Sequence, residues 1–311
     1  MKVYRNISEF KKLENAVVTQ GTFDGVHAGH QKILSNLCEK TKILKGESVV
    51  LTFFPHPRMV LFPDDDSIKL INTLEENIEL LAQTGIDHLI IFEFSKEFAK
   101  LSALHFVRDI IVNTIGTKHL IVGYDHRFGH NREGSYTDLN EYAQLYNFSL
   151  EMINEVDINE ITVSSTKIRN AILQGEMEIA TDYMQHDFTI HGRVVEGNKL
   201  GRTIGFPTAN IQIKESYKII PANGVYAVIV SVQGVQYSGM LNIGKRPTIN
   251  GLDRVIEVNI FNFDASIYNE VIGISFVKRI RDEQKFPSLE ELKKQLFIDK
   301  EITEKILNNR G

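Results

Sequence analysis

The sequence predicts an α/β domain followed by a small all-β domain. In residues 1–186, short apolar runs alternate with stretches of helical periodicity, which is typical of a doubly wound parallel sheet. In residues 187–311, short alternating runs are separated by Gly, Pro and Asn, which favours a small antiparallel β-barrel, and a helical stretch closes the chain. A chain of 311 residues that is 42% hydrophobic can bury two separate cores.

Composition and charge narrow the class of protein. The net charge of −5 leaves no basic footprint for nucleic acid. The one cysteine, Cys38, excludes an internal disulfide and fits a reducing compartment. The N-terminus lacks the apolar region of a signal peptide, and no apolar run is long enough to span a bilayer. We therefore expect a cytoplasmic protein with no membrane or nucleic-acid partner, and the sequence leaves its oligomeric state open.

The first domain contains four apolar runs that we expect to be parallel strands. They occupy residues 16–19, 48–53, 88–92 and 120–122. Helices are expected between them: one with Ile33, Leu34 and Leu37 on one face, one from a capping box at 73–76 to Gly85, and one around 103–111.

A glycine-rich turn follows the first apolar run, with the sequence Gly-Thr-Phe-Asp-Gly-Val-His-Ala-Gly-His at residues 21–30. Such a strand-to-helix turn directs backbone N–H groups and the positive end of a helix at one point, which favours phosphate. His27 and His30 stand at the start of that helix and can reach the same point. The alternative is a tight turn with two solvated histidines. Three glycines, an Asp and two histidines at one junction favour the phosphate site.

Two polar loops are expected at the same edge of the sheet, because ligands of open α/β sheets lie at the carboxyl ends of the strands. One loop follows the second run, where His56 lies between two prolines and Arg58 follows the second of them. The other, at residues 123–134, follows the fourth run, carries Arg127 and Arg132, and suits a phosphorylated, partly aromatic substrate. The alternative for the first loop is that it simply terminates the strand, and the alternative for the second is a solvated loop without a ligand.

A helix is expected to open near residues 163–169, where Val-Ser-Ser-Thr-Lys-Ile-Arg places hydroxyl groups ahead of Arg169. Ser and Thr satisfy the first N–H groups of a helix, and hydroxyls together with Arg also suit a polyphosphate. Helix capping alone would account for the hydroxyls but would not require Arg169.

The second domain contains five short runs that we expect to be antiparallel strands. They occupy residues 189–195, 224–230, 235–240, 255–261 and 271–276. A capping box at 288–291 starts the last helix, which carries Leu289, Leu292 and Leu296 on one face.

The densest polar stretch of this domain is Gly-Asn-Lys-Leu-Gly-Arg-Thr-Ile-Gly-Phe-Pro-Thr-Ala-Asn at 197–210. Its glycines let the backbone approach phosphates, and its Lys and Arg supply positive charge. Thr208 and Asn210 are two apart on an extended segment, point the same way and offer oxygen ligands to Mg²⁺. The spacing alone indicates no more than a phosphate loop. Glu257 is a charge on an otherwise apolar strand, and an isolated residue of this kind is more often simply the solvent-facing one.

These motifs resemble two enzyme families. Residues 21–30 and the Ser-Ser-Thr-x-Ile-Arg at 164–169 resemble the two signatures of the nucleotidylyltransferase superfamily, and the first resembles its FAD synthetase branch. The Gly-Phe-Pro-Thr-Ala-Asn at 205–210 resembles the riboflavin kinases, as do residues 242–248 and 281–286. The whole chain is similar to the prokaryotic bifunctional riboflavin kinase/FMN adenylyltransferases. The resemblance implies a Rossmann-like adenylyltransferase domain at 1–186 and a kinase barrel at 187–311.

The resemblance also implies a role for each candidate residue. His27 and His30 would serve adenylyl transfer, and Glu257 would be the catalytic base of the kinase. Mg²⁺ would be held by Thr208 and Asn210. Implied contacts to ATP and its phosphates come from Gly21, Phe23, Asp24, Gly29, Ser164, Ser165, Thr166, Arg169, Gly197, Lys199, Gly201, Arg202 and Gly205. Implied contacts to flavin come from His56, Arg58, Asp125, Arg127, Arg132, Arg281 and Glu283.

The implied chemistry is two ATP-dependent steps with riboflavin, FMN, ATP and FAD as substrates and products. In the barrel, Glu257 would take the proton from the ribityl 5′-hydroxyl, which attacks the γ-phosphate of ATP. In the α/β domain, the FMN phosphate would attack the α-phosphorus of a second ATP and expel pyrophosphate. Two rival hypotheses are a nucleotidylyltransferase with another acceptor, such as a phosphorylated alcohol, and a non-catalytic flavin-binding regulator.

Overall fold

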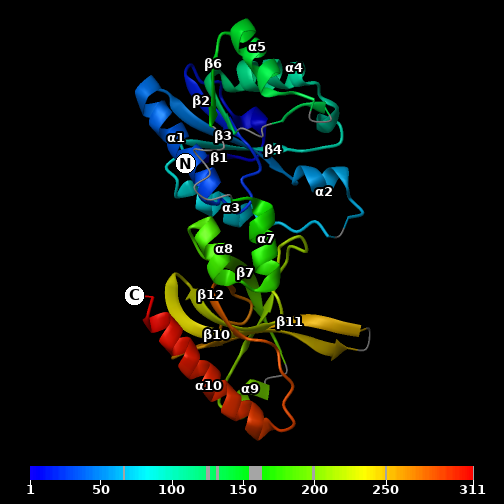
Figure 1. Cartoon of the computed structure of the whole chain (residues 1–311), viewed down its shortest axis with the longest axis vertical. Coiled ribbons are helices and arrows are strands. Elements are labelled where there is room, and N and C mark those ends of the chain that lie inside the picture. Colours follow the sequence, from blue (N-terminus) through cyan, green and yellow to red (C-terminus); the bar gives the residue numbers. More distant parts are fainter. Residues whose placement is uncertain are drawn as a thin grey trace. The chain divides into compact units, whose positions relative to one another are not determined.

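The chain divides into two compact units, which Figure 1 draws as a ribbon. Unit 1 comprises Met1–Ile68 and Thr73–Ser164, and unit 2 comprises Lys69–Asn72 and Ser165–Gly311. The computed structural model describes residues 1–65, 67–123, 127–130, 133–153, 163–197, 200–248 and 251–310.

Within the described residues, unit 1 contains a six-stranded parallel sheet with the order β1-β4-β3-β2-β5-β6. This confirms the predicted doubly wound parallel sheet. The edge strands β1 and β6 were not predicted, because each is short and partly exposed and its apolar run is therefore weak. The strands are β1 (Lys2–Tyr4), β2 (Ala16–Gln20), β3 (Glu47–Phe54), β4 (His88–Glu93), β5 (Thr117–Gly123) and β6 (Ser149–Ile153).

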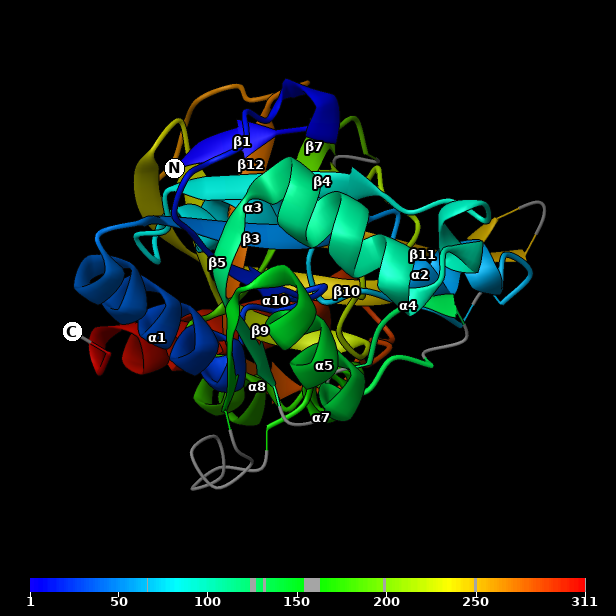
Figure 2. The ribbon, with the colours of Figure 1, turned by 90° about the horizontal axis from the view of Figure 1, so that it is seen from above.

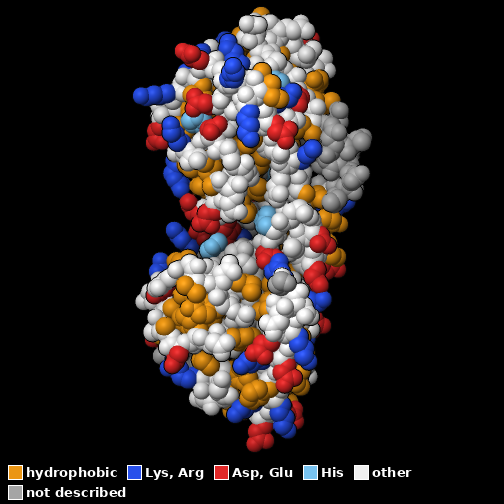
Figure 3. Space-filling view, turned by 90° about the vertical axis from the view of Figure 1, so that its left-hand side faces the viewer, with side chains coloured by type: hydrophobic (Ala, Val, Ile, Leu, Met, Phe, Trp, Pro, Cys, Tyr) orange, Lys and Arg blue, Asp and Glu red, His pale blue; other side chains and the backbone are white. Residues whose placement is uncertain are grey.

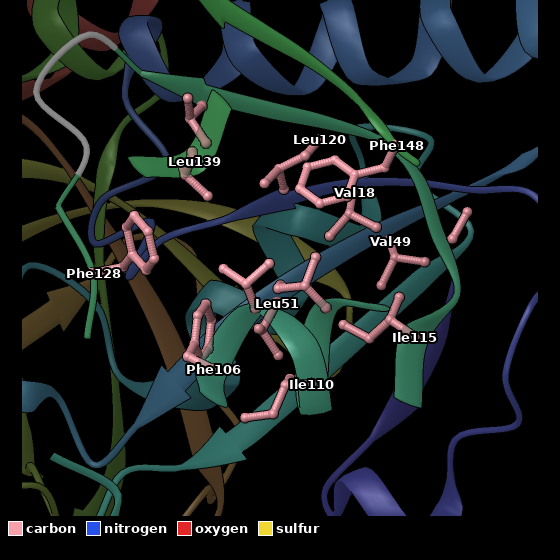
Figure 4. Close-up of a cluster of buried hydrophobic side chains, with 14 of the residues drawn as sticks. Val18, Val49, Leu51, Phe106, Ile110, Ile115, Leu120, Phe128, Leu139 and Phe148 are labelled. Atoms are coloured by element: carbon pink, nitrogen blue, oxygen red, sulfur yellow. The ribbon is translucent and has the colours of Figure 1, made fainter. Parts of the chain in front are cut away.

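Helices cover both faces of this sheet. Val17 and Val18 are neighbours on β2 and both are fully buried, because successive side chains of a strand point to opposite faces. Val17 belongs to one core with Leu34 of helix α1, which packs against β2, β3 and β5 (Figure 2). Val18 belongs to the other core with Ile110 of the π-helix η3 (Figure 4). In the part of unit 1 that the structure describes, the helices are η1 (Ile7–Glu9), α1 (Ala28–Leu44), α2 (Pro57–Leu61), α3 (Leu74–Ala82), η2 (Phe98–Lys100), α4 (Ala103–His105), η3 (Phe106–Ile115) and α5 (Tyr136–Tyr146).

Unit 2 contains a closed antiparallel barrel with the strand order β10-β11-β8-β7-β12-β9. Helix α10 (Leu289–Asn308) lies against β9, β10 and β12 on the outside of the barrel (Figure 1), so the predicted barrel with a closing helix is confirmed. The short strand β8 was not predicted as a separate strand. The barrel strands are β7 (Phe188–Val195), β8 (Ala209–Gln212), β9 (Gly224–Val232), β10 (Val235–Thr248), β11 (Gly251–Ile260) and β12 (Val271–Arg281), and α9 (Leu200–Thr203) lies between β7 and β8 in the chain.

Two helices that precede the barrel in sequence, α7 (Ser165–Gln174) and α8 (Met177–Met184), also belong to unit 2. Gly175 between them lies so close to the barrel that a Cβ there would be 2.8 Å from the Tyr226 hydroxyl and from Cδ of Arg279. The N–H of Ala222 donates to the carbonyl of Ile172 at 3.3 Å. The contacts within each unit therefore place the boundary before α7. The boundary at residue 186 stays a prediction about where the two activities separate.

A short segment from the N-terminal half, residues 69–72, is part of unit 2 as well. Leu70 forms a parallel β-bridge with Lys218. Lys218 is 2% exposed, and its Nζ donates to the carbonyls of Ile71 and Thr189 at 2.7 Å each. A buried ammonium group is tolerated only with such partners. Lys218 therefore fastens this segment to the first strand of the barrel.

Charged side chains of both signs are interspersed on the face drawn in Figure 3. In the described part of the chain, no helix is long and apolar enough to cross a membrane.

Candidate active sites

The turn between β2 and α1 contains backbone conformations that are rare for ordinary residues. Gly25 has a φ of 88°, and its neighbours Phe23 and Val26, at 49° and 37°, also lie in the left-handed region. Such conformations cost free energy and cluster at ligand sites, where successive N–H groups form concavities for anions. Phe23, Asp24 and His27 are all less than 9% exposed. The predicted phosphate turn is thus a packed loop, which does not fit the alternative of a solvated His27.

Hydrogen bonds from neighbouring elements hold the start of this turn. The N–H of Gly21 donates to the carbonyl of Leu51 on β3 at 3.0 Å. The carbonyl of Thr22 accepts from Thr52 Oγ1 at 3.4 Å and from Asn77 Nδ2 on α3 at 3.2 Å. Asn77 was not predicted as a site residue, because an Asn on a helical stretch gives no local signal of a partner so far along the chain.

The two predicted histidines meet at the start of α1. His27 is the N-cap of the helix, and its Nδ1 accepts from the N–H of His30 at 3.4 Å. The two rings stack with centroids 3.6 Å apart and planes 16° apart, and Phe23 packs edgewise against His30 at 5.2 Å. Because Nδ1 of His27 is an acceptor, a neutral His27 ring carries its proton on Nε2. Phe23, which was predicted to contact ATP, thus packs its ring against His30.

The surroundings of His30 favour its neutral form. Its Nδ1 is buried and has no hydrogen-bond partner within the described residues. Burial lowers the pKa of His30 well below its ordinary value, and the neighbouring His27 lowers it further.

The strand order places this turn at the switch point of the sheet. β2 pairs with β3 on one side and with β5 on the other, and ligands of open α/β sheets bind at such points. The loop after β3 ends at the same edge of the sheet. There Nδ1 of His56 accepts from the N–H of Arg58 at 3.2 Å and caps α2. The strand order therefore brings these two predicted flavin residues to the same edge as the turn.

The loop after β5, also predicted to contact flavin, is described in part. Arg127 is exposed, and Phe128 is buried in the core that contains Phe106. A β-bridge between Phe128 and Gly134 closes the loop at its base. Asp125 and Arg132 lie outside the described residues.

Helix α7 opens where the hydroxyl-rich motif predicts it. Ser164 precedes the helix, Ser165 and Thr166 lie in its first turn, and Arg169 lies about one turn further along. The residues from Ser165 onward belong to unit 2. Their contact with ATP remains a prediction.

The loop that leads into β8 is folded tightly around its glycines. A Cβ at Gly197 would be 2.0 Å from Nδ2 of Asn210, and a Cβ at Gly201 would be 2.1 Å from the carbonyl oxygen of Phe206. Gly205 has a φ of 87°, which side chains rarely adopt. Gly197 therefore allows the backbone to approach Asn210, a predicted metal ligand, closely.

The barrel brings the predicted catalytic base and a predicted metal ligand together. Glu257 on β11 lies directly opposite Asn210 on β8 in the antiparallel ladder. Thr208, the other predicted metal ligand, comes immediately before β8 and is exposed. Arg202 is exposed on α9, and Lys199 lies outside the described residues.

The end of β12, where Arg281 is the last residue, is held by α10. The Arg281 guanidinium pairs with the Asp299 carboxylate, with Nη2 at 2.7 Å from Oδ2 and Nε at 3.0 Å from Oδ1. Asp299 is fully buried and also accepts from Gln295 Nε2 at 2.9 Å. Asp299 was not predicted as a partner of Arg281, because an acidic residue on an amphipathic helix usually faces solvent. Arg281 thus has a structural partner, and its contact with flavin remains a prediction.

Glu283 joins two other parts of the barrel. Its carboxylate accepts from the N–H of Lys245 and from Nδ2 of Asn223, each at 3.1 Å. Gly244 leaves the space for this contact, because a Cβ there would be 2.4 Å from Oε1 of Glu283. The predicted contact of Glu283 with flavin is not tested by these interactions.

Comparison with known proteins identifies the family. The family model for FAD synthetase matches residues 9–167, and the model for riboflavin kinase matches residues 184–307. The bifunctional riboflavin kinase/FMN adenylyltransferase of Buchnera aphidicola subsp. Schizaphis graminum is 37% identical over 313 residues, 99% of each chain. The chain belongs to the bifunctional riboflavin kinase/FMN adenylyltransferase family. The family member of Escherichia coli strain K12 is 37% identical over 302 residues, 96% of each chain.

A solved structure shows the same two-unit fold as this member of the family. It is a crystal structure from Streptococcus pneumoniae described as a macrolide-efflux protein, and it matches with a TM-score of 0.88 at 33% identity. The match covers 97% of this chain and 98% of that one. The family that the sequence motifs indicated is therefore confirmed. Both domains of the chain belong to families that use ATP.

Proposed function

We propose that this chain makes FAD from riboflavin in two steps that each consume ATP. The barrel would phosphorylate riboflavin to FMN, and the α/β domain would transfer AMP from a second ATP to FMN and release pyrophosphate. The proposal is supported by two candidate sites in a family member that has both domains. One is the histidine pair at the start of α1, and the other is the Glu257–Asn210 pair of the barrel.

For adenylyl transfer, the turn at residues 21–30 supplies backbone N–H groups, the helix N-terminus and the two histidines. Their geometry supports stabilisation of the charge that develops on the α-phosphate while the FMN phosphate attacks it. The reaction needs orientation and electrostatic stabilisation but no covalent intermediate. Ser164, Ser165, Thr166 and Arg169 at the start of α7 would bind the leaving pyrophosphate.

For phosphorylation, Glu257 would accept the proton of the ribityl 5′-hydroxyl as it attacks the γ-phosphate. Thr208 and Asn210 would hold Mg²⁺ with ATP, and their hydroxyl and amide oxygens are the hard ligands that this ion prefers. The close approach of Gly197 to the Asn210 amide supports this assignment, since the backbone leaves no room there for any side chain at 197. When bound, Mg²⁺ would neutralise phosphate charge.

We further propose that His56, Arg58 and Arg127 contact FMN in the α/β domain, and that Arg281 and Glu283 contact flavin in the barrel. Asp125 and Arg132 keep the same proposed role but lie outside the described residues. We also propose that the protein works in the cytoplasm on small molecules, without a nucleic-acid or membrane partner.

An assay with separated products tests the proposed function. The full-length protein is incubated with riboflavin, ATP and Mg²⁺, and FMN and FAD are resolved by chromatography. The expected result is FMN followed by FAD, and FAD alone when FMN is supplied. A protein that adenylylates another phosphorylated alcohol but not FMN would support the rival adenylyltransferase, and tight flavin binding without turnover would support the regulator.

A further inference from the structure

The loop at residues 200–208, which leads into β8, is docked on the barrel by an apolar contact. Phe206 is 5% exposed and clusters with Met240 and Phe261. Its ring also lies 5.0 Å from that of Phe297 on α10. The aromatic side chain therefore anchors the body of the loop against β10, α10 and Phe261, the residue that follows β11.

A second, polar contact acts at the end of the same loop. Asn259 on β11 is 7% exposed, and its Nδ2 donates to the carbonyl oxygen of Pro207 at 2.6 Å. The peptide group that begins with this carbonyl carries the N–H of Thr208, so the hydrogen bond orients the backbone directly before Thr208. Asn259 is two residues after Glu257, and alternate residues of a strand point to the same face.

We infer that Asn259 is a positioning residue for phosphoryl transfer, which rests on the proposed kinase function. Its hydrogen bond to Pro207 holds Thr208 where the hydroxyl can serve magnesium-bound ATP. Phe206 already docks the loop, so the effect of the Asn259 amide falls on the orientation of the next peptide. Asn259 itself touches neither ATP nor flavin in this assignment.

The isosteric substitution Asn259→Asp is the sharpest test, because an ionised carboxylate cannot donate to a carbonyl. Asn259→His is the matched control, because an imidazole N–H of similar reach can donate. In a third variant, Asn259→Ser, the side chain is too short to reach Pro207. This variant replaces Asn259→Asp in the comparison if Asn259→Asp does not fold. Folding is checked for each variant by its melting temperature.

The main readout is the affinity for ADP with Mg²⁺, measured by titration calorimetry in a double-mutant cycle with Thr208→Val. Nucleotide bound at the adenylyltransferase site contributes equally to all four proteins and cancels in the cycle. We expect Asn259→Asp to weaken MgADP binding about tenfold, which corresponds to about 1.4 kcal/mol. The effect should be much smaller in the Thr208→Val background, and Asn259→His should bind like the parent.

Kinetics separate this role from a merely structural one. We expect Asn259→Asp to raise the KM for ATP in riboflavin phosphorylation and to leave the adenylylation of supplied FMN unchanged. A folded Asn259→Asp variant with parental MgADP affinity, or effects of the two substitutions that add fully, would overturn the inference. A parent protein that does not phosphorylate riboflavin would instead overturn the proposed kinase function.

Discussion

Glu257 and Asn210 lie directly opposite each other on the antiparallel strands β11 and β8. Opposed residues in such a ladder have Cα atoms about 4.5–5.5 Å apart, so the two side chains have access to the same place. A carboxylate at this position is suited to deprotonate a hydroxyl next to a metal-bound phosphate. The pairing thus joins the proposed base and the proposed metal ligand in a single site.

The first prediction concerns Glu257→Gln, which keeps the size of the side chain but removes the base. We expect riboflavin phosphorylation to fall by about 100-fold to 10,000-fold, the usual contribution of a general base. Adenylylation of supplied FMN should stay at the parental rate. The control is Glu270→Gln, at a carboxylate that accepts from Gln233 elsewhere on the barrel. Kinase activity close to the parent's in Glu257→Gln would show that Glu257 is only a strand residue.

The second prediction concerns His30→Ala, which removes one polar group at the start of α1. The loss of one preorganised group at developing charge costs about 3 kcal/mol, or roughly a hundredfold in rate. We expect this variant to convert riboflavin to FMN normally and to accumulate FMN. His105→Ala is a matched control, since His105 is exposed in unit 1. FAD formation at the parental rate in His30→Ala would refute the assignment.

The third prediction concerns the pH dependence of stability. The pKa of His30 is lowered in the folded protein. Below the ordinary histidine pKa of about 6.5, the unfolded chain therefore binds more protons at His30 than the folded protein does. The contribution of His30 to the free energy of unfolding is therefore complete above that pH and is lost as the pH falls towards the folded pKa. We expect His30→Gln to lose less stability than the parent between pH 7.5 and pH 5, as measured by urea denaturation. Equal losses in the two proteins would contradict a lowered pKa at His30.

The fourth prediction concerns the buried ion pair of Arg281 with Asp299. Asp299→Asn leaves a partly buried guanidinium without its counter-charge, and breaking such a pair typically costs about 3–5 kcal/mol. We expect the barrel to unfold at a lower urea concentration. The matched control is Lys294→Ala on the same helix, at an exposed side chain, which should cost less than about 0.5 kcal/mol. An unfolding curve for Asp299→Asn like that of the control would contradict a stabilising role for the pair.

The fifth prediction compares two fragments of the chain. Both Asp187–Gly311 and Ser165–Gly311 contain the proposed kinase residues, so both should phosphorylate riboflavin. The longer one keeps the contact of Ile172 with Ala222 and of Gly175 with Tyr226. We therefore expect it to melt higher, by about 4 °C or more. Equal melting temperatures would show that α7 and α8 do not support the barrel. A shorter fragment that folds but is inactive would show that the kinase site needs residues that precede Asp187.

The fold and the family could be predicted from the sequence because their signals are local. Apolar runs such as 16–19 and 48–53 mark buried parallel strands, and the turn at 21–30 concentrates glycines and histidines within ten residues. The edge strands could not be predicted, because β1 and β6 are short and only partly buried.

The residues that support the sites could not be predicted, because their partners are brought close only by the fold. Asn77 is 55 residues from Thr22, and Lys218 is 147 residues from Ile71. Asp299 is 18 residues from Arg281 and lies on a different element. In the sequence each of these residues reads as an ordinary surface polar residue.

One mixing experiment tests most directly whether the two steps occur at two separate sites. Glu257→Gln and His30→Ala are each given riboflavin, ATP and Mg²⁺, first alone and then in an equimolar mixture, and FAD is measured over time. The account predicts little FAD from either variant alone and substantial FAD from the mixture, because the FMN made by His30→Ala is adenylylated by Glu257→Gln. FAD formation by either variant alone at the parental rate, or no FAD from the mixture, would contradict it.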